Sequence, residues 1–172
     1  MRLPFSYSKI IAALTVASGI LALLCLVLLA VALANHPEAI SDPVQILRVP
    51  DLNISLLRGS MLADIAGYYL LLLPLIYYLC PYLRKQTSWA DLLTFCATAY
   101  ALGGAIGAAL ISEVVTWLYT EYYQATPVQQ EGIRAVFRAV TYLVYEGLWN
   151  LLGSLFAGTW WLLMGICTAY FS

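Results

Sequence analysis

The chain has 172 residues, of which 63% are hydrophobic and only 10% are charged, and its formal net charge is −1. Soluble domains are roughly 45–50% apolar and about 25% charged, so eight Lys/Arg and nine Asp/Glu cannot cover a soluble surface of this size. This balance also leaves no basic surface for nucleic acid. We therefore expect one all-α integral membrane domain over residues 1–172, with membrane lipid as a partner and no nucleic-acid partner.

Four segments are long and apolar enough to cross a bilayer, which takes about 20 helical residues. We predict spans at 10–34, 60–79, 90–119 and 142–170, packed as a four-helix bundle. The first segment also has the basic start of a signal peptide, but its uncharged run is far longer than a signal core of about 7–15 residues. Ser88 and Asp91 have the spacing of a capping box at the start of the third span. The apolar stretch at 135–171 is too short for two spans, so we predict one, preceded by an interfacial segment.

The two longer connections, at 35–59 and 120–141, mix aliphatic and charged residues, which is typical of amphipathic segments on a membrane interface. Lys and Arg divide four against four between the two sides, so this count alone does not decide the orientation. Because Arg2 and Lys9 precede the first span and Arg84 and Lys85 lie in a very short loop, we predict a cytoplasmic N-terminus. Both longer connections would then lie on the outer side.

Apart from Asp91 at the start of the third span, three acidic residues lie within the predicted spans and are candidates for a site, namely Asp64, Glu113 and Glu146. At about 1.5 Å per residue, all three fall near the outer boundary of the membrane. An ionisable residue in a span suggests a functional site. One interpretation is a network of ion pairs between helices, with Arg58 and Arg138 as partners. The other is a polar vestibule, completed by Asn150 one turn after Glu146, that binds a cation, a proton or a polar ligand.

Gly103 and Gly107 form a GxxxG pattern in the third span. Small residues at this spacing let another helix approach closely. The pattern predicts close helix packing, either inside the chain or in a homo-oligomer.

The residue types needed for catalysis and metal binding are scarce. The chain has one histidine, His36, and four cysteines scattered at 25, 80, 96 and 167, which is not the spacing of a zinc site. No nucleophile and base have the setting of a hydrolase. We therefore predict no enzyme activity, no metal and no cofactor.

Two stretches resemble an uncharacterised bacterial multi-span membrane family that is known only as a domain of unknown function. They are LR, AD and GYYLLL at 57–58, 63–64 and 67–72, and AVFRAV, GLWNLL and GTWW at 135–140, 147–152 and 158–161. The resemblance covers most of the chain, although the family usually has further spans after its counterpart of Trp160-Trp161. It implies location in the bacterial inner (plasma) membrane and no particular chemistry.

The leading functional interpretation is a small non-catalytic membrane protein that serves as a scaffold or accessory subunit. Its glycine-rich and polar helix faces would contact lipid, a protein partner or a second copy. The alternative is a transporter, channel or sensor component that uses the outer vestibule.

Overall fold

The computed structural model describes residues 5–33, 36 and 38–171, and every regular element in these ranges is a helix. Four helices are long and apolar enough to cross a membrane, namely Tyr7–Ala32, Ile54–Gln86, Ala90–Gln124 and Pro127–Cys167. The prediction of an all-α chain with four such helices is confirmed. Arg2, the predicted end of the first span at 34 and the start of the first connection at 35 lie outside the described residues.

Three of the four long helices change their winding along their length. The first is the single element α1 (Phe5–Ala32). The second runs from α3 (Ile54–Asp64) through the π-helical η2 (Ile65–Tyr69) and the 3-10 turn η3 (Leu70–Leu72) into α4 (Leu73–Gln86). The third joins α5 (Ala90–Leu110) to α6 (Thr116–Gln124) through the π-helical η4 (Ile111–Val115). The fourth joins α7 (Pro127–Tyr142) to α8 (Ser154–Phe171) through the π-helical η5 (Leu143–Gly153).

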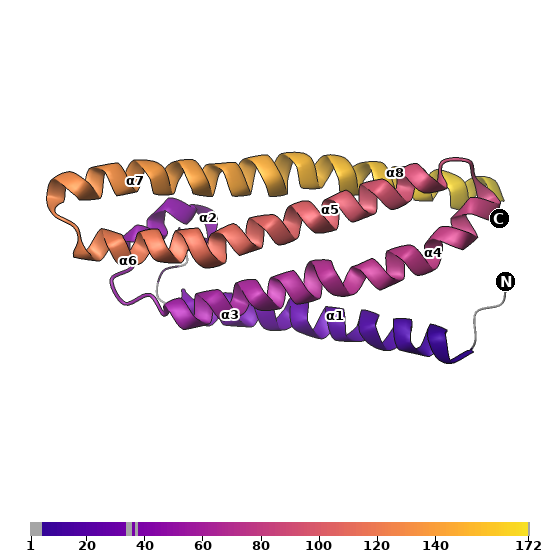
Figure 1. Ribbon diagram of the computed structural model, residues 1–172, viewed down its shortest axis with the longest axis horizontal. Coiled ribbons are helices and arrows are strands. Elements are labelled where there is room, and N and C mark those ends of the chain that lie inside the picture. Colours follow the sequence, from indigo (N-terminus) through magenta and orange to yellow (C-terminus); the bar gives the residue numbers. More distant parts are fainter. Residues whose placement is uncertain (1–4, 34–35, 37, 172) are drawn as a thin grey trace.

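The long helices run side by side in an elongated bundle (Figure 1). The third helix is central, since 50% of its apolar stretch is buried, against 11% for the first and for the fourth helix. The start of α1, the α4–α5 connection and the end of α8 lie at one end of the bundle, and the α6–α7 turn lies at the other (Figure 1). The outer faces carry apolar side chains that are more than half exposed, such as Val16, Leu23 and Leu155.

The second and fourth long helices begin before the predicted spans, because polar side chains cap them at earlier residues. Asn53 accepts a hydrogen bond from the Leu56 amide at 3.1 Å, so α3 begins at Ile54 rather than at Ser60. The side chain of Gln129 accepts from the Thr126 amide at 3.0 Å, and Pro127 opens α7. Most of the predicted connection at 120–141 is therefore helix, continuous with the fourth span.

The predicted capping box at the α4–α5 connection does not form. Trp89 is the N-cap residue of α5, and its amide donates to Oγ1 of Thr87 at 3.1 Å. The Asp91 carboxylate instead pairs with Arg84, from which it accepts at 2.8 and 2.9 Å. Two N–H groups of the Arg84 guanidinium thus occupy the carboxylate that a capping box would need.

The first connection closes the end of the bundle. Its two short elements are α2 (Glu38–Ser41) and the 3-10 helix η1 (Pro43–Arg48), and Ile46, Leu47 and Val49 are buried in the main core. The Tyr119 hydroxyl holds this segment in place: it donates to the Val49 carbonyl at 2.6 Å and accepts from the Leu52 amide at 3.3 Å. We call residues 38–53 the end segment.

We expect Tyr119→Phe to destabilise the end segment by about 1–3 kcal/mol, because buried backbone groups lose their partner. The measurement is thermal unfolding in detergent, together with the rate of proteolysis within 38–53. Tyr142→Phe is the matched control, since Tyr142 is largely exposed. Equal stability of the two variants would contradict this role for Tyr119.

Candidate functional site

Asp64 lies on the buried face of α3. Leu57, Met61 and Asp64 follow one another at helical spacing, with exposed fractions of 1%, 4% and 8%. An apolar helix face therefore carries a carboxylate into the bundle. The π-helical η2 begins at the next residue, and its Tyr68 and Tyr69 line the same cavity as Asp64.

The Asp64 cavity has a volume of about 340 Å³ and is lined by residues of all four long helices and of the end segment. Aromatic side chains form much of its wall, namely Tyr68, Tyr69, Tyr100, Tyr145 and Trp149. Several of these rings touch: Tyr69 meets Tyr100 at a centroid distance of 5.9 Å, and Tyr145 meets Trp149 at 4.8 Å. Aliphatic side chains and the Cys25 thiol complete the lining.

The Asp64 carboxylate has no partner within the part of the chain that the structure describes, either as a hydrogen bond or as an ion pair. Every fully buried side-chain nitrogen or oxygen of the described residues has a hydrogen-bond partner. Because the Asp64 carboxylate has none, its oxygens are not fully buried and remain open to the cavity. The groups that interact with it electrostatically are the Cys25 thiol and the phenols of Tyr69, Tyr100 and Tyr145. None of them supplies a positive charge.

Glu113 lies outside this cavity, on the surface of η4. Its Oε2 accepts from Nη2 of Arg58 at 2.9 Å, and Arg58 also donates to the Ser112 carbonyl at 3.3 Å. The pair joins α3 to the third helix, but the two side chains are 46% and 68% exposed. Exposed pairs contribute about 0–1 kcal/mol, so this one orients the helices more than it stabilises them.

Glu146 lines a second hollow, a crevice of about 290 Å³ between the start of η1 and the fourth helix. Its Oε2 accepts from Nδ2 of Asn150 at 3.2 Å, as the one-turn spacing predicts. Arg138 and Asp42 line the same crevice. Among the described residues, Arg138 forms no ion pair with Glu146.

The prediction of one vestibule shared by Asp64, Glu113, Glu146 and Asn150 therefore needs correction. Asp64 lines an interior cavity, Glu113 forms a surface ion pair, and Glu146 lines a lateral crevice and accepts a hydrogen bond from Asn150. Tyr145 lines both the cavity and the crevice, so it separates the two hollows.

Each of the three acidic residues lies in a π-helical segment or directly before one. Asp64 directly precedes η2, Glu113 lies in η4, and Glu146 lies in η5. Such widened turns are frequent at functional sites. No sequence pattern marked these segments in advance.

The close packing predicted at Gly103 and Gly107 occurs at Gly107 and at the neighbouring Gly104, but not at Gly103. A Cβ at Gly107 would overlap the Trp149 indole, and one at Gly104 would overlap the Tyr69 ring. Gly103 faces open space, with nothing within 4 Å of a Cβ. The glycines of α5 thus receive aromatic rings of the cavity wall, and the Trp149 Nε1 donates to the Gly104 carbonyl at 3.3 Å.

The close approach between helix backbones lies at Gly67, which the sequence pattern did not single out. A Cβ at this position would lie 2.7 Å from the Ala22 nitrogen and 2.9 Å from the Leu21 carbonyl carbon of α1. Ser18 of α1 donates to the Gly67 carbonyl at the same crossing.

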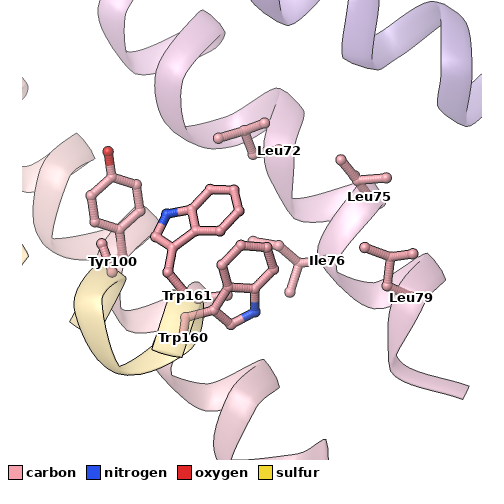
Figure 2. Close-up of a pocket in the computed structure, with 9 residues that line it drawn as sticks. Leu72, Leu75, Ile76, Leu79, Tyr100, Trp160 and Trp161 are labelled. Atoms are coloured by element: carbon pink, nitrogen blue, oxygen red, sulfur yellow. The ribbon is translucent and has the colours of Figure 1, made fainter. Parts of the chain in front are cut away.

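A separate apolar groove of about 320 Å³ lies near the other end of the bundle. Figure 2 shows Leu72, Leu75, Ile76 and Leu79 along one side of it, with Tyr100, Trp160 and Trp161 opposite. No charged residue lines the groove in the described part of the chain, so apolar contacts would dominate the binding of an occupant.

No protein-family model, curated protein or solved structure matches the chain. The resemblance to an uncharacterised bacterial family stays a prediction.

Proposed function

We propose that the protein is a multi-pass protein of a bacterial plasma membrane, with its N-terminus in the cytoplasm. The exposed apolar faces of the four long helices support insertion, because an apolar surface of this extent is unfavourable in water. The end of α4, which carries Arg84 and Lys85 in its last turn, lies at the same end of the bundle as the start of α1, which supports this orientation.

Single cysteines introduced as Val128→Cys and Gln86→Cys test this topology in a background without the four native cysteines. We expect a membrane-impermeant maleimide added to intact cells to label position 128 and not position 86, because the two lie at opposite ends of the bundle. Permeabilised cells are the control in which both positions are labelled. The reverse pattern would overturn the orientation.

We infer that the protein is non-catalytic and binds a small ligand inside the bundle, as a transporter or sensor component. The observation that carries this proposal is the nearly buried Asp64 carboxylate, which lines a cavity and has no partner among the described residues. Burial of a charged group without a partner costs free energy. Such a cost is expected where a ligand supplies the missing contacts.

Two native cysteines provide a matched test of whether the cavity admits small polar molecules. Cys25 lines the cavity and Cys96 lies elsewhere in the core, yet both are 4% exposed. We expect methyl methanethiosulfonate to modify a protein that retains only Cys25 at least ten times faster than one that retains only Cys96. The background carries Asp64→Asn, which removes the effect of the carboxylate on the thiol. Equal rates would contradict an accessible cavity.

A second candidate function, supported by the apolar groove of Figure 2, is that of a scaffold or accessory subunit. A helix of a protein partner or of a second copy would fill this groove. Native mass spectrometry of the gently extracted protein should then show a stoichiometric second polypeptide. Ala157→Trp in the groove should remove it, whereas Leu162→Trp on an exposed face should not. A single chain with bound lipid would exclude this candidate.

A further inference from the structure

The Asp64 cavity has the chemistry of a site for one positive charge. Among the described residues that line it, Asp64 is the one carboxylate and none is basic. An anionic ligand would therefore meet only repulsion, and a neutral one would leave the carboxylate without a counter-charge.

The donor set does not suit an inorganic metal ion. Ca²⁺ takes six to eight oxygen ligands, and Mg²⁺ requires near-ideal octahedral coordination by oxygen. The cavity provides one carboxylate among phenols, a thiol and aliphatic side chains. No group of three or more His, Cys, Asp or Glu that could hold a metal occurs in the described part of the chain.

The aromatic wall does suit an organic cation. Tyr and Trp faces attract ammonium groups within about 6 Å of the ring centroid, and sites for quaternary ammonium ligands are built from such rings. Four tyrosines and one tryptophan line this cavity around one carboxylate. Its volume of about 340 Å³ lies in the range of small-molecule sites, roughly 300–1,000 Å³.

We infer that the cavity binds an organic monocation, a protonated or quaternary amine, with Asp64 as its counter-ion and the surrounding rings as its cage. This inference rests on the ligand-binding function proposed above and names the class of the ligand. Tyr145 lines both the cavity and the lateral crevice, and among the described residues of the crevice two carboxylates, Asp42 and Glu146, outnumber the single arginine. The crevice thus favours the approach of a cation.

Binding of radiolabelled phenyltrimethylammonium to the full-length protein in detergent tests the inference, with tert-butylbenzene as the neutral competitor of the same shape. We expect saturable binding of the cation that excess tert-butylbenzene does not displace. Asp64→Asn should weaken binding at least tenfold, and Tyr145→Leu should weaken it roughly 2- to 30-fold through the lost ring. Glu113→Gln, which removes a carboxylate outside the cavity, should leave the affinity within twofold.

Tetramethylammonium and choline, as smaller competitors, extend the test to other sizes of monocation. Circular dichroism and size-exclusion profiles confirm that each variant is folded. Binding that is equal in Asp64→Asn, displacement by tert-butylbenzene, or competition by Na⁺ and by no organic cation would each overturn the inference. If Cys25 is accessible to methyl methanethiosulfonate but no organic cation binds, the ligand class is wrong and the ligand-binding function stands. If Cys25 is inaccessible as well, both proposals fail.

Discussion

Gly67→Leu is expected to destabilise the protein by about 3 kcal/mol, the upper end of the usual cost of overpacking, because a side chain at this position meets the backbone of α1. A flexible neighbour could rotate away, but the Ala22 nitrogen and the Leu21 carbonyl carbon can move only if the two helices separate. Separation would also break the hydrogen bond from Ser18 to the Gly67 carbonyl. Thermal unfolding in detergent, followed by fluorescence-detected size exclusion, measures the loss.

Gly103→Leu is the matched control, since it makes the same substitution in another long helix. Open space surrounds this position, so we expect no destabilisation and a gain of at most about 1 kcal/mol from the better helix former. A smaller apparent size of Gly103→Leu with unchanged unfolding would instead place Gly103 in a contact between copies. Equal destabilisation by the two substitutions would contradict the assignment of the backbone crossing to Gly67.

These two glycines show what the sequence could and could not predict about packing. Spacing alone marked Gly103 and Gly107 as small residues on one face of a span. Spacing could not identify the groups that pack against these glycines. Such a helix has apolar side chains on all its faces, so the pattern does not distinguish a face toward lipid from a buried face. The structure buries Gly104 and Gly107 under aromatic rings and leaves Gly103 open.

The four long helices were predictable for a simple physical reason. Length and hydropathy are properties of each segment alone, so no knowledge of neighbours was needed. The ends were less predictable, because Asn53 and Gln129 provide caps outside the apolar runs and lengthen two of the helices. Helix caps depend on local hydrogen bonds that hydropathy does not register.

The candidate site was predictable only in part. The sequence identified Asp64, Glu113 and Glu146 as acidic residues at a similar depth, but depth does not determine direction around the helix axis. A side chain turns by about 100° per residue, and the π-helical turns beside these residues shift that direction further. Asp64 consequently points into the cavity while Glu113 meets Arg58 on the surface. The aromatic wall of the cavity draws on three helices, and no local pattern predicts such an assembly.

The second large effect concerns Asp64 and has the opposite sign to that of Gly67. We expect Asp64→Asn to raise the free energy of unfolding by about 1–2 kcal/mol, because it removes an unpartnered buried charge while keeping the shape of the side chain. Asp64→Leu should stabilise at least as much, since the wall of the cavity is largely apolar. Thermal unfolding in the same detergent, without added cation, is the measurement.

Glu113→Gln provides the contrast, because it removes one partner of the exposed pair with Arg58 and should cost no more than about 1 kcal/mol. Replacing a carboxylate that stabilises the fold lowers the stability of the protein. Replacing one that binds a ligand raises the stability of the protein and weakens ligand binding. Destabilisation by Asp64→Asn would therefore make Asp64 a structural residue and remove the main support for a ligand site. Stabilisation together with lost binding of phenyltrimethylammonium would show that Asp64 lowers the stability of the fold and is needed for ligand binding.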